Sequence, residues 1–160
     1  MHIRTARFSD LPALAAAEAL CFPPAEAASE AALAARLRVY PNHFWLLEKD
    51  GHLVSFINGP VTDEPQLQDP MYADPSCHNE AGAWQMIFGV NTLPPYRRQG
   101  RAGQVMERVL ADARAQGRAG CVLTCKEALI HYYARFGFRN EGLSASTHGG
   151  AAWYSMRLVF

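Results

Sequence analysis

Apolar and polar positions along the chain predict strands that alternate with helices. Alternating or continuous apolar runs mark strands, and apolar residues three and four positions apart mark helices. The predicted elements, in chain order, are a strand over 2–7, helices over 11–22 and 30–40, strands over 43–49, 52–59 and 83–92, a helix over 105–116, a strand over 120–125, a helix over 126–136 and a hairpin over 139–160. This order predicts a single mixed α/β domain over residues 1–160.

Short polar residues mark where several of these elements begin. Ser9 or Asp10 is expected to cap the first helix and Ser29 the second, because their side chains accept hydrogen bonds from free amides at helix starts. Asp50-Gly51 joins two apolar runs and is typical of a two-residue hairpin turn. The sequence therefore predicts two helix starts and one tight turn.

Composition changes this picture little. Hydrophobic residues make up 49% and charged residues 19% of the chain, as in an ordinary globular protein. At this length a chain buries about 70% of its unfolded surface. A formal net charge of zero argues against general binding to nucleic acid. No apolar run approaches about 18 residues, and residues 1–10 lack the apolar core of a signal peptide. We therefore expect no membrane span and a cytoplasmic location.

Cysteine and histidine positions do not predict a metal site. The closest pair, Cys121 and Cys125, lies in a run that has the pattern of a strand, and no Cys-x-x-Cys spacing occurs. The six histidines are scattered without a His-x-x-x-His pair. We expect buried, reduced thiols and no structural zinc.

Charge is distributed unevenly, and this is more informative than the net value. Residues 60–82 contain five acidic residues and no Lys or Arg, without a clear period. Residues 97–118 contain six arginines against Glu107 and Asp112. A long loop in a compact domain is usually functional. One region is therefore suited to a cation and the other to an anion.

The arginine-rich region begins at a turn between a strand and a helix. Residues 94–103 have two prolines, then Arg97, Arg98 and Arg101, with Gly100 and Gly103 between and after them. Free amides at the start of a helix and the positive end of its dipole favour an anion such as phosphate, and guanidinium groups add donors. There is no Gly-Lys-Ser/Thr, so this is not a nucleotide-hydrolysing loop. A solvated, arginine-rich helix start remains the plain alternative.

This turn resembles that of the GNAT acetyltransferase superfamily. Arg97-x-x-Gly100-x-Ala102 is similar to its Arg/Gln-x-x-Gly-x-Gly/Ala signature, and the order of elements is also similar. Residues 123–138 resemble the corresponding helix of the arylalkylamine N-acetyltransferases, with a likeness that extends over nearly the whole chain. The resemblance implies the GNAT fold, a central mixed sheet of about seven strands flanked by about four helices.

The resemblance also implies a site for acetyl-CoA as co-substrate, without a metal. The turn would hold its pyrophosphate, and the preceding strand would pair with its pantetheine arm. An amide near Val90 would stabilise the oxyanion, an interaction able to supply about 3 kcal/mol. The implied cofactor-binding residues are Val90, Asn91, Thr92, Arg98, Gln99, Gly100, Arg101, Ala102 and Gly103.

Tyr133 matches the tyrosine to which this family assigns the role of general acid. A phenol has a pKa of about 10, near that of a thiol, so it is suited to protonate the leaving thiolate. The alternative is that Tyr133 only packs, as we expect for Tyr132. Cys125, followed by Lys126, is the one candidate nucleophile: the lysine could lower the pKa of its thiol, although a packing role is favoured. We therefore expect direct attack in a ternary complex.

The proton acceptor differs from that of the vertebrate relatives. The resemblance aligns their histidine pair with Met86 and Phe88, which cannot accept a proton. The proton of the amine needs another route. The open candidates are water leading to Glu26, Asp63, Glu64 or His148.

The acceptor site implied by the resemblance is partly aromatic. Trp153 would contact the acceptor, Met86 and Phe88 would add an apolar wall, and His148 lies in a turn at the same end. Glu26, in a proline-rich segment between two helices, would pair with a second ammonium group. For each residue a purely structural role is the alternative. The acidic segment 60–82 independently favours an amine acceptor, without choosing between an arylalkylamine and a polyamine.

These observations predict an acetyl-CoA-dependent N-acetyltransferase that acts on a small primary amine. Two alternatives remain: acetylation of a protein or peptide amine, and a catalytically idle acyl-CoA-binding module. The long segment 60–82 resembles a cover and disfavours the first, and Tyr133 disfavours the second. Nucleic acid and membrane partners are not expected, and nothing in the sequence specifies an oligomeric state.

Overall fold

A computed structural model describes all residues, 1–160, and the chain forms two compact units. The first unit comprises Met1–Gly59 and Gly89–Val109, and the second comprises Pro60–Phe88 and Leu110–Phe160. The chain thus passes between the units three times. The prediction of one domain over 1–160 stays a prediction.

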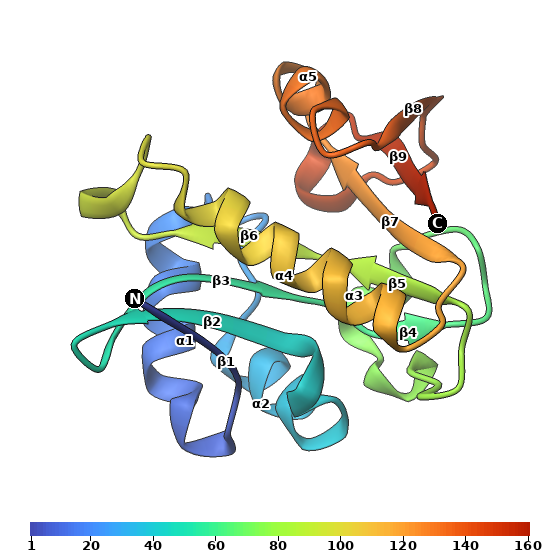
Figure 1. The fold of residues 1–160 in the computed structure, drawn as a ribbon. Coiled ribbons are helices and arrows are strands. Elements are labelled where there is room, and N and C mark those ends of the chain that lie inside the picture. Colours follow the sequence, from blue (N-terminus) through green and yellow to red (C-terminus); the bar gives the residue numbers. More distant parts are fainter. The chain divides into compact units, whose positions relative to one another are not determined.

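The first unit is built on a four-stranded antiparallel sheet (Figure 1). Its strands lie in the order β1-β2-β3-β6, so that β6 forms one edge. Their bounds are β1 His2–Thr5, β2 Phe44–Lys49, β3 His52–Asn58 and β6 Gly89–Thr92. The edge position of β6 leaves one side of this strand without a partner in its sheet.

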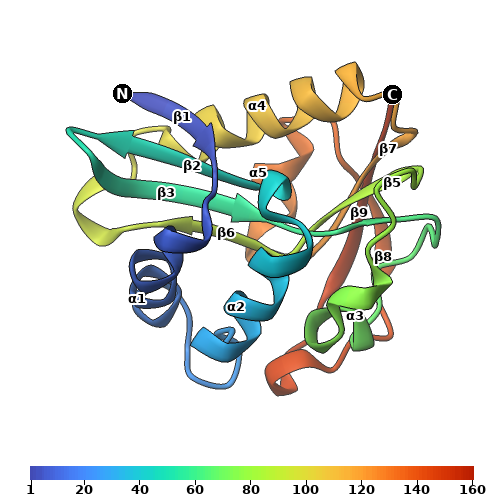
Figure 2. The ribbon, with the colours of Figure 1, turned by 90° about the horizontal axis from the view of Figure 1, so that it is seen from below.

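Two helices lie side by side against this sheet, α1 (Leu11–Cys21) and α2 (Glu30–Val39) (Figure 2). Leu14 and Leu33, one from each helix, are fully buried with Phe44 and Phe56 of the sheet. Burial of these side chains is the main force that holds the helices to the strands. This core supports β6 through its neighbour β3.

The predicted caps had different outcomes. Ser29 caps α2, since its hydroxyl accepts a hydrogen bond from the amide of Ala32 at 3.1 Å. The prediction that Ser9 or Asp10 caps α1 was wrong: Asp10 occupies the N-cap position, but no side chain accepts a hydrogen bond from the start of this helix. The carboxylate of Asp10 instead pairs with Arg4 at 2.7 Å and accepts from the amide of Arg7 at 2.7 Å. The Arg4 guanidinium holds the pKa of Asp10 below its ordinary value. The carboxylate thus binds groups that precede α1.

The second unit is built on a five-stranded mixed sheet with the order β4-β5-β7-β9-β8. β5 and β7 are parallel, and the other neighbours are antiparallel. The bounds are β4 Val61–Thr62, β5 Trp84–Ile87, β7 Gly120–Cys125, β8 Arg139–Leu143 and β9 Tyr154–Val159. Helix α5 (Ile130–Ala134) and the β8–β9 hairpin lie close together in Figure 1.

The segment 60–82 has more structure than its sequence indicated. It contains β4 and the short helix α3 (Pro70–Ala73). Leu67 and Met71 are buried against Met86 and Val122 of the sheet. These contacts between apolar side chains hold the segment over one face of β5 and β7.

The α/β fold class is confirmed, with a different count of elements. The structure has nine strands in two sheets and five α-helices, where the resemblance implied about seven strands and about four helices. The predicted strand over 83–92 is divided at Phe88 into β5 and β6. Each part then pairs in a different sheet.

Helix α4 (Arg101–Ala115) confirms the predicted amphipathic helix and connects the first unit to the second. Val105, Met106 and Val109 are fully buried at helical spacing, while Glu107 is exposed. None of the helices combines the length and the hydropathy that a membrane span requires.

The hairpin turn between β2 and β3 gives a test of the first unit's stability. Asp50 and Gly51 have φ values of 51° and 77°, as a two-residue turn of this kind requires. A Cβ at Gly51 meets no atom within 4 Å, so its substitution changes only backbone strain. We expect Gly51→Ala to lower the free energy of unfolding by about 1 kcal/mol in urea denaturation.

Gly51→Asn is the matched control. Asparagine tolerates a positive φ better than alanine does, so this variant should lose clearly less stability. Equal losses for the two variants would show that the turn's backbone conformation is not the cause.

Candidate active site

The arginine-rich turn directly follows the edge strand β6. Its first residues, Pro94–Tyr96, form one turn of 3-10 helix, and Arg98 has a φ of 61°. Gln99 donates a hydrogen bond to the carbonyl of Pro95 at 3.2 Å. Gly100 has a φ of 73° and no atom within 4 Å of an added Cβ. The backbone is therefore in the left-handed region at Arg98, and the space beside Gly100 is empty of protein atoms.

The start of α4 presents free main-chain donors. The amide of Gln104 donates to the carbonyl of Gly100 at 3.1 Å, which makes Gly100 the residue just before the helix. The amides in the first turn of a helix have no acceptor within it. Here these amides belong to Arg101, Ala102 and Gly103. Together with the helix dipole they favour an anion at this position.

The three arginines of the turn add positive charge that no carboxylate neutralises. Arg97 donates through Nε to the carbonyl of Thr92 at 3.0 Å, and Arg101 donates to the side-chain oxygen of Gln104 at 3.2 Å. Arg98 is exposed, and none of the three forms an ion pair. Their guanidinium groups remain available to an anionic ligand.

Strand β6 offers main-chain groups along its open edge. The amide of Leu93 donates to the carbonyl of Val54 on β3 at 3.0 Å, and the register pairs Asn91 with Phe56. In an antiparallel pair alternate residues face the partner, so the main-chain groups of Val90 and Thr92 face the other way. The carbonyl of Thr92 is already bonded, since it accepts from Arg97 at 3.0 Å and from the thiol of Cys21 at 3.4 Å. The open part of the edge is therefore at Val90 and the amide of Thr92. Asn91 differs from its two neighbours, because its main chain faces β3 and its side chain is buried.

Tyr133 lies on α5 and is buried, with 6% of its surface exposed. Its ring packs edge-on against Tyr132, with centroids 5.0 Å apart, and against Phe138. Burial raises the pKa of Tyr133 well above its ordinary value, with smaller contributions from Tyr132 and Cys125. The phenol therefore keeps its proton over the physiological pH range.

Cys125 is a buried thiol at the end of β7. Burial raises the pKa of Cys125 to about 11, so it is a thiol near neutral pH. The expectation that Lys126 could lower this pKa was wrong. The ammonium group of Lys126 instead lies over the ring of Trp153, 5.7 Å from its centroid. The geometry disfavours Cys125 as a nucleophile.

Four aromatic side chains of the second unit form an aromatic cluster: Tyr72, Phe88, His148 and Trp153. Tyr72 lies 4.5 Å from Phe88 and stacks on His148 at 4.6 Å between ring centroids. Trp153 donates from its indole nitrogen to the carbonyl of His148 at 2.7 Å. All four are half-buried, so part of each ring is open to a ligand.

The structure thus brings together three of the predicted acceptor residues and adds Tyr72. Tyr72 was missed because it lies in the segment without a clear period. The one signal that could have found it is Pro70, which is typical of the first position of a helix. Met86 is fully buried against Val122 and so belongs to the core beneath the cluster.

The other predicted residues lie in local turns. Glu26, in the first unit, is half-buried in a turn where its amide donates to the carbonyl of Pro23 at 2.9 Å. Asp63 accepts a hydrogen bond from the side chain of Asn79, and Glu64 accepts one from the amide of Gln66. Asp63 and Glu64 thus have structural roles in the segment 60–82.

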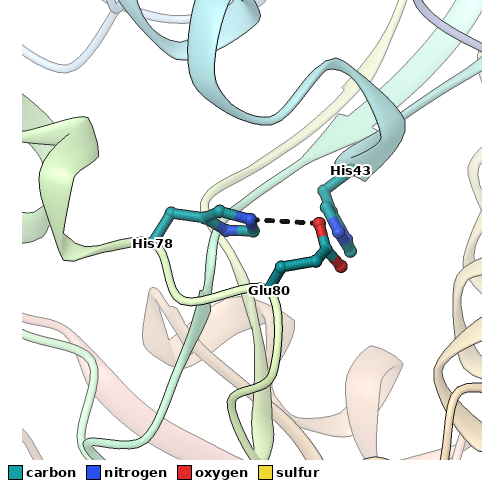
Figure 3. A group of neighbouring side chains, drawn as sticks. All are labelled: His43, His78 and Glu80. Atoms are coloured by element: carbon teal, nitrogen blue, oxygen red, sulfur yellow. Dashed lines mark hydrogen bonds and ion pairs between the residues drawn. The ribbon is translucent and has the colours of Figure 1, made fainter.

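The acidic segment is partly neutralised by a residue outside it. Glu80 pairs with Arg118 at 2.9 Å and with Nε2 of His78 at 3.2 Å (Figure 3). Nδ1 of His78 accepts a hydrogen bond from the amide of Val61, so the neutral ring carries its proton on Nε2. Glu80 therefore helps to hold the segment 60–82 in place. The negative charge of the segment comes from its other acidic residues.

Comparisons with known proteins agree with this arrangement. A sequence model described as the acetyltransferase (GNAT) family matches residues 11–138. Serotonin N-acetyltransferase of Mesocricetus auratus is 26% identical over 110 residues, which are 68% of this chain and 52% of that protein. The chain therefore spans about half the length of the curated relatives it matches.

Two solved structures share the fold. The GphF GNAT-like decarboxylase in complex with isobutyryl-CoA has a TM-score of 0.86 at 24% identity and covers 99% of both chains. The loading GNATL domain of CurA from Lyngbya majuscula has a TM-score of 0.84 at 19% identity, over 99% of this chain and 96% of that one.

The start of α4 can be tested by adding a negative charge to it. Ala102→Asp would place a carboxylate among the free amides, where it would fill the anion position and repel a diphosphate. We expect the Kd for coenzyme A, measured by calorimetry, to rise by about tenfold or more. Ala115→Asp makes the same change at the other end of α4 and should alter the Kd little. Similar weakening by both variants would show that the helix start is not the binding site.

Proposed function

Because this chain belongs to the acetyltransferase (GNAT) family, we propose that it transfers the acetyl group of acetyl-CoA to a small primary amine. The observation that carries the proposal is the start of α4 in the first unit. Between Val90 and Gly103 the chain offers first an open strand edge, then guanidinium groups that form no ion pair, and then the free amides of the helix start. This sequence of groups fits a diphosphate followed by an extended, amide-containing arm.

The proposed binding mode uses main-chain groups first. The amides of the α4 start hold the pyrophosphate, and Arg98 and Arg101 add charge. The pantetheine arm pairs with the open edge of β6, as an added strand does. The amide of Val90 faces that edge and donates to the carbonyl oxygen of the thioester as negative charge develops on it.

The proposed reaction is a direct transfer. The lone pair of the neutral amine attacks the thioester carbon, the C–S bond breaks, and the leaving thiolate takes a proton from the Tyr133 hydroxyl. The acetylated nitrogen loses its extra proton by the route described next, and the Tyr133 phenolate takes up a proton from solvent before the next turnover. Since the pKa of Tyr133 is raised by burial, the acid is in its protonated form before each turnover.

Met86 and Phe88 cannot accept the proton of the amine, so another group must accept it. Of the four candidates, Asp63 and Glu64 are exposed and hold turns. Glu26 lies in a turn of the first unit, and His148 belongs to the aromatic cluster. His148 is the titratable group among them that contacts the proposed acceptor surface, which supports it as the proton acceptor, directly or through water.

The acceptor is proposed to rest on the aromatic cluster. Half-buried rings suit an apolar or aromatic body that carries an amine. A protein or peptide amine and an idle acyl-CoA-binding module are the alternatives. Incubation with acetyl-CoA and a panel of amines and peptides, while free thiol is followed, separates them. Thiol release with small amines alone supports the proposal, and no release above background with any acceptor overturns it.

Tyr133→Phe tests the general acid. This variant keeps the packing and removes the proton donor, so we expect kcat to fall by about tenfold or more with an unchanged Kd for coenzyme A. Tyr132→Phe removes the neighbouring hydroxyl and should leave kcat nearly unchanged. An unaltered kcat in Tyr133→Phe would eliminate the acid role.

Cys125→Ala tests direct attack against a covalent intermediate. With a pKa of about 11, the thiolate fraction of Cys125 is very small at pH 7.5. We expect the variant to keep kcat within about twofold. Mass spectrometry of wild-type protein with acetyl-CoA alone should find no acetylated Cys125. A large loss of kcat together with such an adduct would contradict the ternary complex.

A further inference from the structure

A pocket of about 630 Å³ lies in the second unit. It is lined by residues 66–70, by Glu141 and residues 143–146 of the β8–β9 hairpin, and by Ser155 of β9. This volume is within the range that holds small organic ligands. The proposed function gives this pocket no role.

The lining of the pocket is negative. Asp69 and Glu141 contribute carboxylates, and no Lys or Arg lines the pocket. Glu141 is balanced by Arg157, whose Nε lies 3.0 Å from it. Asp69 has no cationic partner: its oxygens accept hydrogen bonds from the hydroxyl of Ser146 at 2.5 Å and the amide of Thr147 at 3.1 Å. One full negative charge therefore remains in the lining.

Ser155 provides an independent sign of a polar ligand. This residue is only 9% exposed and its hydroxyl makes no hydrogen bond with any protein group. Its oxygen is not enclosed by protein, and Ser155 lines the pocket. The hydroxyl is therefore able to bond to a polar group that enters the pocket.

The three segments that line the pocket also carry residues of the aromatic cluster: Tyr72 lies shortly after Asp69, His148 shortly after Ser146, and Trp153 shortly before Ser155. One contact connects the two in space. Thr124, on the neighbouring strand, pairs with Ser155, and its hydroxyl lies 3.4 Å from that of Tyr72. An extended molecule would pass from the cluster to the pocket along this contact.

We propose that this pocket holds a second ammonium group of the acceptor, so that the preferred acceptor is an aliphatic diamine or polyamine. The proposal rests on the proposed function, since the first amine is the one acetylated. The second ammonium donates to Asp69 and Ser155, and the methylene chain crosses the rings of the cluster. An arylalkylamine with a neutral far end gains nothing from Asp69.

The test compares amines that differ only at the far end. The probes are α,ω-diamines of three to six carbons, the alkylamines of the same lengths, and the amino alcohols, which replace the second ammonium by a neutral hydroxyl. For the diamine that fits best, we expect kcat/KM to exceed that of the matched alkylamine and amino alcohol by about tenfold.

Asp69→Asn tests whether this preference comes from the pocket. It keeps the size of the side chain but only one acceptor oxygen, so it removes the charge and one of the two hydrogen bonds from Ser146 and Thr147. We expect the KM for the diamine to rise about tenfold more than the KM for the alkylamine, which reports any effect of the lost hydrogen bond alone. Glu141→Gln, on β8, should shift the KM for the diamine in the same direction by less, since Arg157 balances Glu141.

Asp74→Asn is the matched control. Asp74 is exposed in the same segment, and its carboxylate hydrogen bonds only to Ser76. Asp74 does not line the pocket. It removes the same charge and should leave both KM values unchanged. Equal shifts for diamine and alkylamine in Asp69→Asn, or an equal shift in Asp74→Asn, would overturn the proposal.

A binding measurement separates failure of this proposal from failure of the proposed function. Calorimetry of the diamine with wild-type protein and with Asp69→Asn needs no turnover. Weaker binding in Asp69→Asn supports the pocket even if no amine is acetylated. An active enzyme that shows no preference for diamines, or equal binding of diamine to both proteins, refutes the pocket and leaves the acetyl transfer standing.

Discussion

The first-turn amides of α4 are the constraint on which the proposed chemistry depends. They have no acceptor within the helix, and Gly100 just before them has a positive φ and no side chain beside them. The chain enters this turn from β6, so the same backbone path that frees the amides also places the open strand edge just before them. An anion at the helix start and an extended arm on the strand are thus recognised by a single continuous stretch of main chain.

Burial sets the chemical state of the residues in the second unit. It raises the pKa of both Tyr133 and Cys125, so the phenol keeps the proton that an acid needs and the thiol lacks the negative charge that a nucleophile needs. The fold alone does not decide the reaction, since a protein named as a decarboxylase shares it. The start of α4 supports the cofactor, and side chains such as Tyr133 and the aromatic cluster support the choice of an amine acceptor.

Local signals in the sequence predicted local structure well. Asp50-Gly51, Ser29 and the apolar spacing of α4 depend on neighbours in the chain, and the structure confirms them. The errors came from ionic partners that no local pattern reveals. Asp10 pairs with Arg4, six residues earlier on β1, and Arg4 also binds Glu48 on another strand. Glu80 pairs with Arg118. The elements in 60–82 are two and four residues long, too short for a period to show. Tyr72 was missed for that reason.

The carboxylate of Asp69 connects two parts of the second unit that are distant in sequence. It holds the loop that leads to His148, from a position just before the helix that carries Tyr72. The loop that carries one of the stacked rings is thus bonded to the same carboxylate that is proposed to bind a cation. A cation bound there would compete with Ser146 and Thr147 for the same two oxygens, so its binding would depend on the order of this loop.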